Sequence, residues 1–442
     1  MIYIPDQSPY RYFIKGLTTK VPLHNESFAT AINFDNSATT PPFISVMDSI
    51  MSFSSWYSSI HRGTGYKSQL SSKIYEDSRK IVADFVGADL EKDAIIYVKN
   101  ATEAINKLSY RLTDDKEDCV ILSTWMEHHS NDLPWRFKYK TDYVEIDEYG
   151  RLLIDDLEKK LKQYNGKVKL VTVTGASNVT GYINPIYKIA SLAHKYGAKI
   201  LVDGAQFVPH CPMDMKPHYS KEHIDYLAFS AHKMYAPFGT GVLIGPKSTF
   251  QKGIPDYCGG GTINSVSRDL VLWANPPEKD EAGTPNVMGV QALVTAIKTI
   301  NELGMKNIEN YETYLLKYTT QEMEKIPGIK LYAHEMNRNT PRVAIIPFNI
   351  EGIHHSITAK ILSGEKAIAV RNGCFCAQPY LQRLLNLSKD SIREYSKEPI
   401  SKRPGVVRLS FGMYNNYKEI QVLLSLLKNI VKNKEYYIKK YS

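Results

Sequence analysis

Short apolar runs alternate with segments of helical periodicity through the first half of the chain. The apolar runs predict strands at residues 94–98, 119–123, 143–146, 170–174, 200–202 and 226–229. Between several of them apolar residues recur every three or four positions, as from Ile189 to Tyr196, where Gly197 stops the pattern. Alternation of this kind predicts an α/β fold with a mostly parallel sheet covered by helices.

The pattern changes in the second half of the chain. It loosens after Pro246, and a long helical stretch at 288–303 predicts a bridge to a second domain. Beyond it we expect strands at 342–346, 368–370 and 406–410, with a helix at 354–363. A final helix is expected to start near Asn416, where Glu419 completes a capping box.

These patterns predict two domains of unequal size. The large domain is expected over residues 41–299, and the small domain from residues 1–40 together with 300–442. With 442 residues, of which 43% are hydrophobic and 23% charged, the chain is long enough for both.

The formal net charge is +9, but the basic excess is spread along the chain. Such a distribution favours a solvated, Lys-rich surface over a nucleic-acid site. It also suits anionic small molecules such as phosphates and carboxylates.

Five cysteines are too few and too irregularly spaced for a secreted disulfide framework. Only Cys374 and Cys376 are close together, and no Cys/His cluster completes a zinc site, so no metal is expected. Residues 1–6 lack the charged start of a signal peptide, and no apolar run approaches the ~20 residues of a membrane span. We therefore expect a cytoplasmic protein without membrane contact.

Lys233 closes the apolar run 226–229, where its ammonium is costly to desolvate. A poorly solvated lysine has a lowered pKa and attacks carbonyl groups, forming an imine. Pyridoxal phosphate is held in this way, and it needs a carboxylate against its ring nitrogen. Asp203, at the end of the preceding strand, offers that carboxylate.

Polar residues cluster where four predicted strands end. The sets are Glu127-His128-His129, Ser177-Asn178, Asp203 with Gln206, and Ser230-His232-Lys233. Because ligands of open α/β sheets bind outside the carboxyl ends of the strands, we expect these sets to converge. The helix predicted over 100–106 can bind phosphate at its N-terminus with the Thr102 hydroxyl, although plain N-capping explains Thr102 equally well. No dinucleotide-binding or Walker glycine motif follows a strand.

Six motifs identify a family in combination. They are Glu-His-His-Ser-Asn, Ser-Asn-Val-Thr-Gly, Val-Asp-Gly-Ala-Gln, Ser-Ala-His-Lys, Ala-Gly-Thr-Pro-Asn and Val-Arg-Asn-Gly-Cys-Phe-Cys-Ala-Gln-Pro. From roughly residue 33 to 429, the chain resembles the class V aminotransferase fold of pyridoxal phosphate enzymes (fold type I). It is most similar to the group II, Suf-type cysteine desulfurases of iron–sulfur cluster assembly, a group that includes selenocysteine lyases. The resemblance implies a large domain with a mostly parallel sheet, a smaller α+β domain and a homodimer.

The resemblance also implies a role for each matching residue around pyridoxal phosphate. Lys233 would hold the cofactor covalently and move protons, Asp203 would pair with the ring nitrogen, and His128 would stack on the ring. The other cofactor-binding residues would be Gln206 at the ring hydroxyl, Ala101, Thr102, Ser230 and His232 at the phosphate, Asn178, and Thr284 reaching the phosphate site of the partner subunit.

The substrate implied by the resemblance is L-cysteine. Arg408 and Asn178 would hold its carboxylate, because the planar guanidinium binds carboxylate bidentately, and His61 and Arg371 would line the pocket. Cys376 would attack the substrate sulfur as a thiolate, leaving alanine and an enzyme-bound persulfide. Arg371 supplies a nearby cation, which favours the thiolate.

Three departures from the family pattern leave alternatives open. Cys374 and Phe375 replace two histidines, as in molybdenum cofactor sulfurases, and Cys374 would relay sulfur, act as a resolving thiol or fill space. Ala101 stands where relatives often have Thr, so this position offers no hydroxyl to the phosphate. An insertion at 381–404 would either shape the docking of a sulfur acceptor or form a neutral loop.

Other activities on the same scaffold remain possible readings of the sequence. They are a selenocysteine lyase, another carbon–sulfur lyase, and a class V aminotransferase or epimerase; a non-catalytic protein that kept the fold is a further reading. The sequence does not identify the sulfur acceptor, whether protein, tRNA or small molecule.

Overall fold

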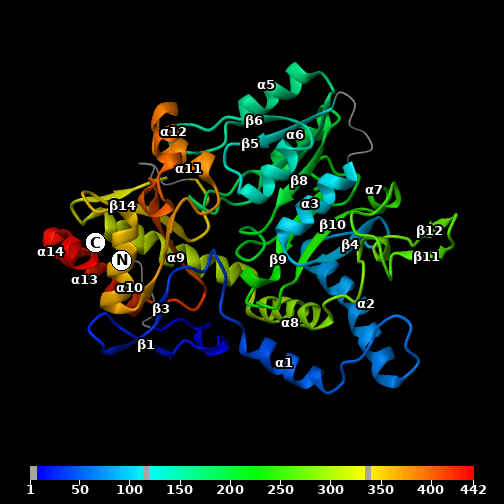
Figure 1. The fold of residues 1–442 in the computed structure, drawn as a ribbon, viewed down its shortest axis with the longest axis horizontal. Coiled ribbons are helices and arrows are strands. Elements are labelled where there is room, and N and C mark those ends of the chain that lie inside the picture. Colours follow the sequence, from blue (N-terminus) through cyan, green and yellow to red (C-terminus); the bar gives the residue numbers. More distant parts are fainter. Residues whose placement is uncertain (1–6, 113–118, 334–339) are drawn as a thin grey trace.

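A computed structural model describes residues 7–112, 119–333 and 340–442 of the chain (Figure 1). The predicted lack of a signal peptide at residues 1–6 lies outside these ranges. Two sheets with their covering helices form the molecule, and the active-site candidates lie between them.

The large sheet has seven strands in the order β4-β10-β9-β8-β7-β5-β6. Their bounds are β4 Asp93–Val98, β5 Val120–Thr124, β6 Lys140–Val144, β7 Val168–Thr174, β8 Lys199–Asp203, β9 Tyr226–Ser230 and β10 Gly241–Pro246. The five strands from β9 to β6 are parallel, and β10 is antiparallel to both of its neighbours. The predicted α/β fold with a mostly parallel sheet is thereby confirmed.

Burial explains which strands the sequence pattern predicted well. Every residue of β4, β5 and β9 is buried, which gives the continuous apolar runs of strands covered on both faces. Edge strand β6 begins and ends earlier than the predicted 143–146, and only Val144 is buried in it. Strand β10 was not predicted, although it is buried up to Gly245. Its Gly241 is required because a Cβ there would lie 2.6 Å from the Asn100 Cα.

Helices cover both faces of the large sheet. They are α1 Ile44–Ser54, α2 Tyr66–Val86, α3 Ala101–Arg111, α4 Leu133–Arg136, α5 Ile154–Tyr164, α6 Ile186–Lys195, α7 Lys247–Gln251 and α8 Val287–Leu303. Helices α1 and α2 both pack against α8, which agrees with the helix predicted over 288–303 (Figure 1). Short 3-10 helices follow at Arg11–Phe13, His129–Asn131, Ala231–Lys233, Glu278–Asp280 and Ile400–Lys402.

The second sheet is antiparallel, in the order β13-β14-β17-β16. Its strands are β13 Ile329–Leu331, β14 Ile345–Ile350, β16 Arg371–Gly373 and β17 Val406–Ser410. Helices α9 Met305–Glu324, α10 His355–Lys366, α11 Gln378–Leu384, α12 Lys389–Lys397, α13 Tyr417–Lys432 and α14 Lys434–Tyr441 accompany it. Strand β14 begins three residues after the predicted start, because Arg342 turns to donate to the Thr180 and Ile345 carbonyls at 2.9 and 2.6 Å.

The start of α13 was predicted in detail, but α13 is not the final helix, because α14 follows it at Lys434. Asn416 is the N-cap of α13, and the reciprocal bonds with Glu419 complete the capping box. The insertion at 381–404 forms most of α11 together with α12, which has no buried residue. Helix α12 therefore lies on the surface, beside α11 and on the same side of the molecule as the second sheet (Figure 1).

The N-terminal segment pairs with strands from the second half of the chain. Strand β3 (Ile32–Asn33) pairs in parallel with β15 (Ile368–Ala369), and Asp35 forms a bridge with Ser410. Two hairpin-like sheets complete the fold, β1 Lys20–Pro22 with β2 Phe28–Thr30, and β11 Ile263–Val266 with β12 Val271–Trp273. The predicted domain boundaries stay a prediction. No helix in the three described ranges is long and apolar enough to cross a membrane.

Candidate active site

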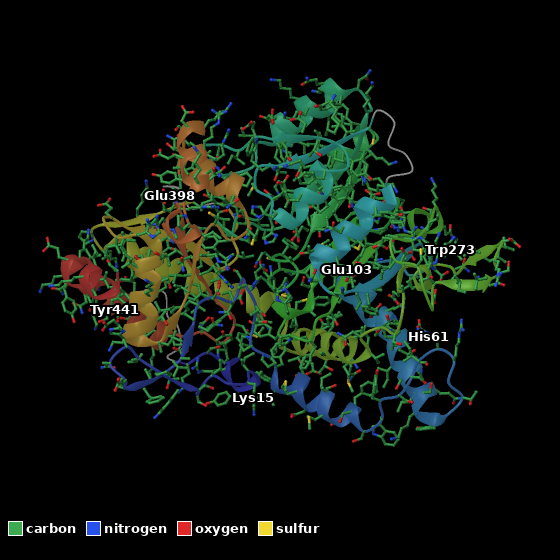
Figure 2. All side chains as sticks on the ribbon, viewed as in Figure 1. Lys15, His61, Glu103, Trp273, Glu398 and Tyr441 are labelled. Atoms are coloured by element: carbon green, nitrogen blue, oxygen red, sulfur yellow. The ribbon has the colours of Figure 1, made fainter. Side chains whose placement is uncertain are left out.

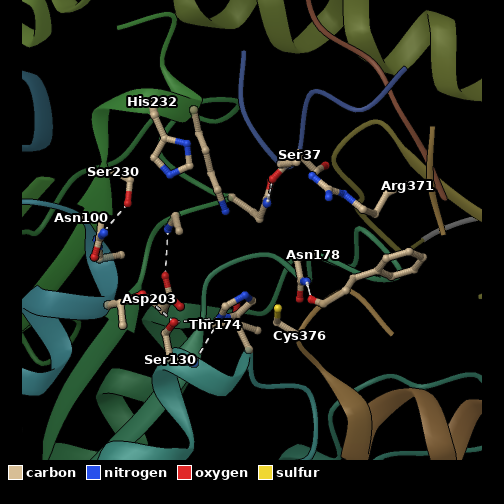
Figure 3. Close-up of a pocket in the computed structure, with 18 of the residues that line it drawn as sticks. Ser37, Asn100, Ser130, Thr174, Asn178, Asp203, Ser230, His232, Arg371 and Cys376 are labelled. Carbon is tan, nitrogen blue, oxygen red and sulfur yellow. Dashed lines mark hydrogen bonds between the residues drawn. The ribbon is translucent and has the colours of Figure 1, made fainter. Parts of the chain in front are cut away.

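A cavity of about 320 Å³ opens at the carboxyl edge of the large sheet, where β7, β8 and β9 end. Twelve of the predicted site residues line it: Ala101, Thr102, His128, Asn178, Asp203, Gln206, Ser230, His232, Lys233, Arg371, Cys376 and Arg408. Figure 3 shows Asn100, Ser230 and His232 on one side of this cavity, with Arg371 and Cys376 on the other. The cavity is therefore built from both sheets.

Lys233 ends the 3-10 turn that follows β9. Burial lowers the pKa of its ammonium to about 8; the negative charge of Asp203 opposes this shift, and the positive charge of Arg408 adds to it. A lysine with such a pKa is partly uncharged near neutral pH. Its nitrogen is then able to act as a nucleophile toward a carbonyl group.

The two histidines that line the cavity are uncharged. Burial, with the charge of Lys233, lowers the pKa of His128 to about 3 and that of His232 to about 4. The backbone N–H of Ser130 donates to His128 Nδ1 at 3.1 Å, which orients the ring. His129 does not line the cavity: its Nε2 accepts the Gln378 N–H at 3.1 Å, and its backbone N–H donates to the Cys376 carbonyl at 2.7 Å.

The first turn of α3 faces the same cavity. Its N-cap Asn100 accepts the Glu103 N–H at 3.0 Å, and the Ala101 N–H donates to Ser230 Oγ at 2.8 Å. The Thr102 hydroxyl bonds the Ser130 hydroxyl at 2.7 Å. Hydroxyl groups and the positive end of a helix dipole therefore converge here, an arrangement that suits a phosphate.

Two buried polar side chains, Asp203 and Gln206, lie at the other end of the cavity. The Asp203 carboxylate accepts the Ala205 N–H at 3.0 Å, and burial raises its pKa. Gln206 donates to the Ser37 carbonyl at 2.7 Å, while its Oε1 is buried with no hydrogen-bond partner among the described residues. A ring with a protonated nitrogen and a hydroxyl group would satisfy both residues, so they fit pyridoxal phosphate.

Arg408 provides a buried cation on β17, with a side chain only 3% exposed. Its Nη1 donates to the Asn178 carbonyl at 2.8 Å and its Nη2 to Asp35 at 3.1 Å, whereas its Nε has no acceptor among the described residues. Burial lowers its pKa to about 10 despite the carboxylate of Asp35. The Phe375 ring covers the guanidinium, 4.8 Å from its carbon. This cation is well placed for a substrate carboxylate.

Cys376 lies in a tight turn between β16 and α11. The Ala377 N–H donates to the Cys374 carbonyl at 3.0 Å, and the central residues Phe375 and Cys376 have φ of 52° and 54°. Left-handed backbone costs a non-glycine residue of the order of 1–2 kcal/mol. Asn178 holds the turn by donating to the Phe375 carbonyl at 2.7 Å. The exposed Cys376 thiol thereby faces the cavity (Figure 3).

Cys374 lies in a different environment from Cys376. Its thiol is 3.6 Å from the Pro404 carbonyl, and it lines a separate cavity of about 90 Å³ beside α11 and α12. Burial raises the pKa of the Cys374 thiol. Of the two cysteines, only Cys376 faces the lysine.

The structure does not bring two predicted residues into the cavity. His61 lies in the loop before α2, where its N–H donates to Ser72 at 2.8 Å, near the edge of the molecule (Figure 2). Thr284 lines another cavity, of about 300 Å³, beside the start of α8. Their roles at the substrate and at the partner's phosphate site stay predictions.

Sequence reasoning missed several residues of the site. They are Asp35, Ser37, Ala38, Asn100, Ser130, Thr174, Ala205 and Phe375. Asn100 carried a usable signal, since an Asn before a helix is a common N-cap. Within the described residues, no group of three His, Cys, Asp or Glu side chains is arranged to hold a metal ion.

Comparison with known proteins gives the family. The model for aminotransferase class V matches residues 32–423. The chain belongs to the class V aminotransferase family. Relatives of this class V chain include a probable cysteine desulfurase of Pyrococcus abyssi, 36% identical over 93% of this chain and 96% of its own length. Another, from Synechocystis, is 35% identical over 91% of each chain.

A solved structure agrees with these sequence relatives. The apo cysteine desulfurase of Thermococcus onnurineus is 32% identical, with a TM-score of 0.81 over 98% of this chain and 99% of its own. The resemblance predicted from the six motifs, a class V enzyme most similar to cysteine desulfurases, is therefore confirmed.

Proposed function

We propose that the protein is a pyridoxal phosphate-dependent cysteine desulfurase. It would convert L-cysteine into L-alanine and receive the substrate sulfur on Cys376 as a persulfide. The observation that carries this proposal is that the Cys376 thiol lines the same cavity as Lys233 and Arg408. A nucleophilic thiol is needed for sulfur transfer, whereas transamination and racemisation do not need one at this position.

The residues that would hold the cofactor follow from the contacts around the cavity. Lys233 would bind it covalently, Asp203 would neutralise the protonated ring nitrogen, and Gln206 would bond the ring hydroxyl. The phosphate would lie at the α3 N-terminus, beside the hydroxyl and ring groups of Thr102, Ser230 and His232. Pyridoxal phosphate, when bound, withdraws electrons from the substrate Cα.

The chain's own groups supply the remaining steps. Arg408 would bind the substrate carboxylate, with Asn178 beside it, and so orient the substrate sulfur toward Cys376. Lys233 Nζ, with its lowered pKa, would remove and return the proton at Cα. The Cys376 thiolate would then form a bond to the substrate sulfur as the Cβ–S bond breaks. The released electron pair and a proton complete the methyl group of alanine.

Cys376→Ala tests this assignment. The purified holoenzyme is expected to form alanine from L-cysteine, and Cys376→Ala to keep the cofactor's visible absorption while losing that activity. Cys258→Ala is the matched control, because Cys258 is also an exposed free thiol but lies outside the cavity. Normal alanine formation by Cys376→Ala would refute the role of this thiol.

The same variant separates the alternative activities. Selenium leaves carbon more easily than sulfur, so a selenocysteine lyase would keep cleaving selenocysteine without Cys376. An aminotransferase or epimerase would process a sulfur-free amino acid at an unchanged rate in both proteins. Comparing L-cysteine, selenocysteine and L-alanine as substrates therefore distinguishes the three.

A homodimer belongs to the same proposal. Thr284, in its cavity beside α8, would contact the phosphate site of the partner subunit. Sedimentation of wild type against Thr284→Ala, with cofactor affinity measured in parallel, tests this. The sulfur acceptor is left open, and the cytoplasm stays the expected location.

A further inference from the structure

Asp35 lies beside the cavity although no motif pointed to it. Its backbone forms a parallel bridge with Ser410, two residues after Arg408 on β17. The Ser410 N–H donates to the Phe34 carbonyl at 2.7 Å, and the Asp35 N–H donates to Asn33 Oδ1 at 2.9 Å. These bonds fix the Asp35 carboxylate relative to the strand that carries Arg408.

Arg371 and Arg408 are direct neighbours across two antiparallel strands. They are register partners on β16 and β17, so their side chains leave the same face of the sheet. Two like charges directly opposite each other in a sheet repel. Both guanidiniums nevertheless line the cavity, and Arg408 is almost fully buried.

The Asp35 carboxylate joins the two arginines. Its Oδ1 accepts from Arg408 Nη2 at 3.1 Å, and its Oδ2 lies 3.1 Å from Arg371 Nη2. Each oxygen therefore serves one guanidinium, and the carboxylate neutralises one of the two positive charges. Arg371, Arg408 and Asp35 together carry a net charge of +1, which a single substrate carboxylate would neutralise.

We propose that Asp35 is the positioning residue of the substrate-carboxylate site, holding Arg371 and Arg408 side by side and setting the net charge of that site. This inference rests on the proposed function for the identity of the substrate. Among the described residues, the Asp35 carboxylate pairs with these two arginines and does not line the cavity, so it acts on the substrate through them. Without its charge, Arg371, whose side chain is half exposed, would move away from Arg408 into solvent.

Asp35→Asn is the direct test, because it removes the charge and keeps the size. The KM for L-cysteine is expected to rise at least about tenfold, while kcat changes by less than about twofold, because the lost interaction concerns carboxylate binding. The dissociation constant of L-alanine, measured by calorimetry on the holoenzyme, should rise by the same factor. Asp142→Asn is the matched control. Asp142 lies on β6, its partly buried carboxylate accepts from Lys160 Nζ at 3.0 Å, and it lies outside the cavity.

A double variant separates positioning from a merely structural role. Arg371→Gln should also raise the L-alanine dissociation constant, and adding Asp35→Asn to it should raise that constant by much less than Asp35→Asn does alone. The two effects are then non-additive, because the repulsion that Asp35 relieves has already been removed. Arg371→Gln also tests the site if Asp35→Asn fails to fold, because the Arg371 side chain is half exposed and its replacement is expected to leave the fold intact.

The outcomes separate this inference from the proposed function. An Asp35→Asn protein with unchanged KM and unchanged L-alanine binding overturns the positioning role, as do additive effects in the double variant. A wild-type protein that binds L-alanine but releases none from L-cysteine refutes the desulfurase and leaves the Asp35 test intact. A wild-type protein that binds no amino acid overturns both.

Discussion

Lys233→Met in the cofactor-free protein is the sharpest test of the electrostatics at the site. The protein holds the Lys233 pKa at about 8 instead of 10.5, because burial outweighs the attraction of Asp203. Between these two pH values the unfolded chain binds a proton that the folded protein has released. Stability is therefore expected to rise with pH across the window from about 8 to 10.5.

The size of this effect follows from the shift. If Lys233 were fully buried, the shift of its pKa from 10.5 to about 8 would lower the free energy of unfolding by about 3 kcal/mol, since one pKa unit is worth about 1.4 kcal/mol. Lys233 is partly open to the cavity, so we expect about 2 kcal/mol after allowing for solvent screening. The wild type should be destabilised by this amount below pH 8, and Lys233→Met should not be.

Denaturant unfolding of both proteins between pH 7 and 10.5 measures the difference. The free-energy advantage of Lys233→Met is expected to shrink by about 2 kcal/mol over that range. Lys279→Met is the control: this buried lysine donates to three carbonyls at 2.7–3.2 Å, so its loss should destabilise the protein. A difference between wild type and Lys233→Met that stays constant with pH would refute the reasoning.

Three further predictions concern sulfur, substrate and stability. After brief exposure of the holoenzyme to L-cysteine, mass spectrometry of alkylated peptides should find the added sulfur on Cys376 and not on Cys374, because burial raises the pKa of the Cys374 thiol. Added sulfur on Cys374, in the wild type or in a Cys376→Ser variant, would contradict this. Arg408→Lys should raise the KM for L-cysteine more than tenfold, because an ammonium cannot replace the forked guanidinium, and an unchanged KM would argue against carboxylate binding there. Asn416→Ala should lower the free energy of unfolding by about 1 kcal/mol through loss of the α13 cap, with activity unchanged, as urea titration can check.

Local chemistry was enough to predict much of the fold. The runs that form β5, β8 and β9 are apolar because both faces of the sheet are covered. The cap at Asn416 was predictable because it joins Asn416 to Glu419, only three residues further along the chain. Strand β10 was missed because its glycines and proline look like a turn. It forms because Gly241 allows β10 to approach Asn100 closely.

Lys233 and Asp203 could be found from the sequence alone. Asp203 is the last residue of β8 and Lys233 follows β9 closely. Parallel strands bring their carboxyl ends to one edge of a sheet, so the two residues had to lie near each other. The motifs around them also identified the family. The sequence by itself therefore determined the half of the cavity around Lys233 and Asp203.

Only the tertiary structure decided how Arg371, Arg408 and Cys376 are held in the cavity. Asp35 meets Arg408 across 373 residues of sequence, and the His129 backbone binds the turn that carries Cys376. Contacts of this kind depend on how the two sheets pack together. Charged residues follow no periodic pattern along the chain from which their partners could be predicted. A carboxylate in a turn-rich N-terminal segment becomes part of the site only when β3 pairs with β15 and carries it to Arg371 and Arg408.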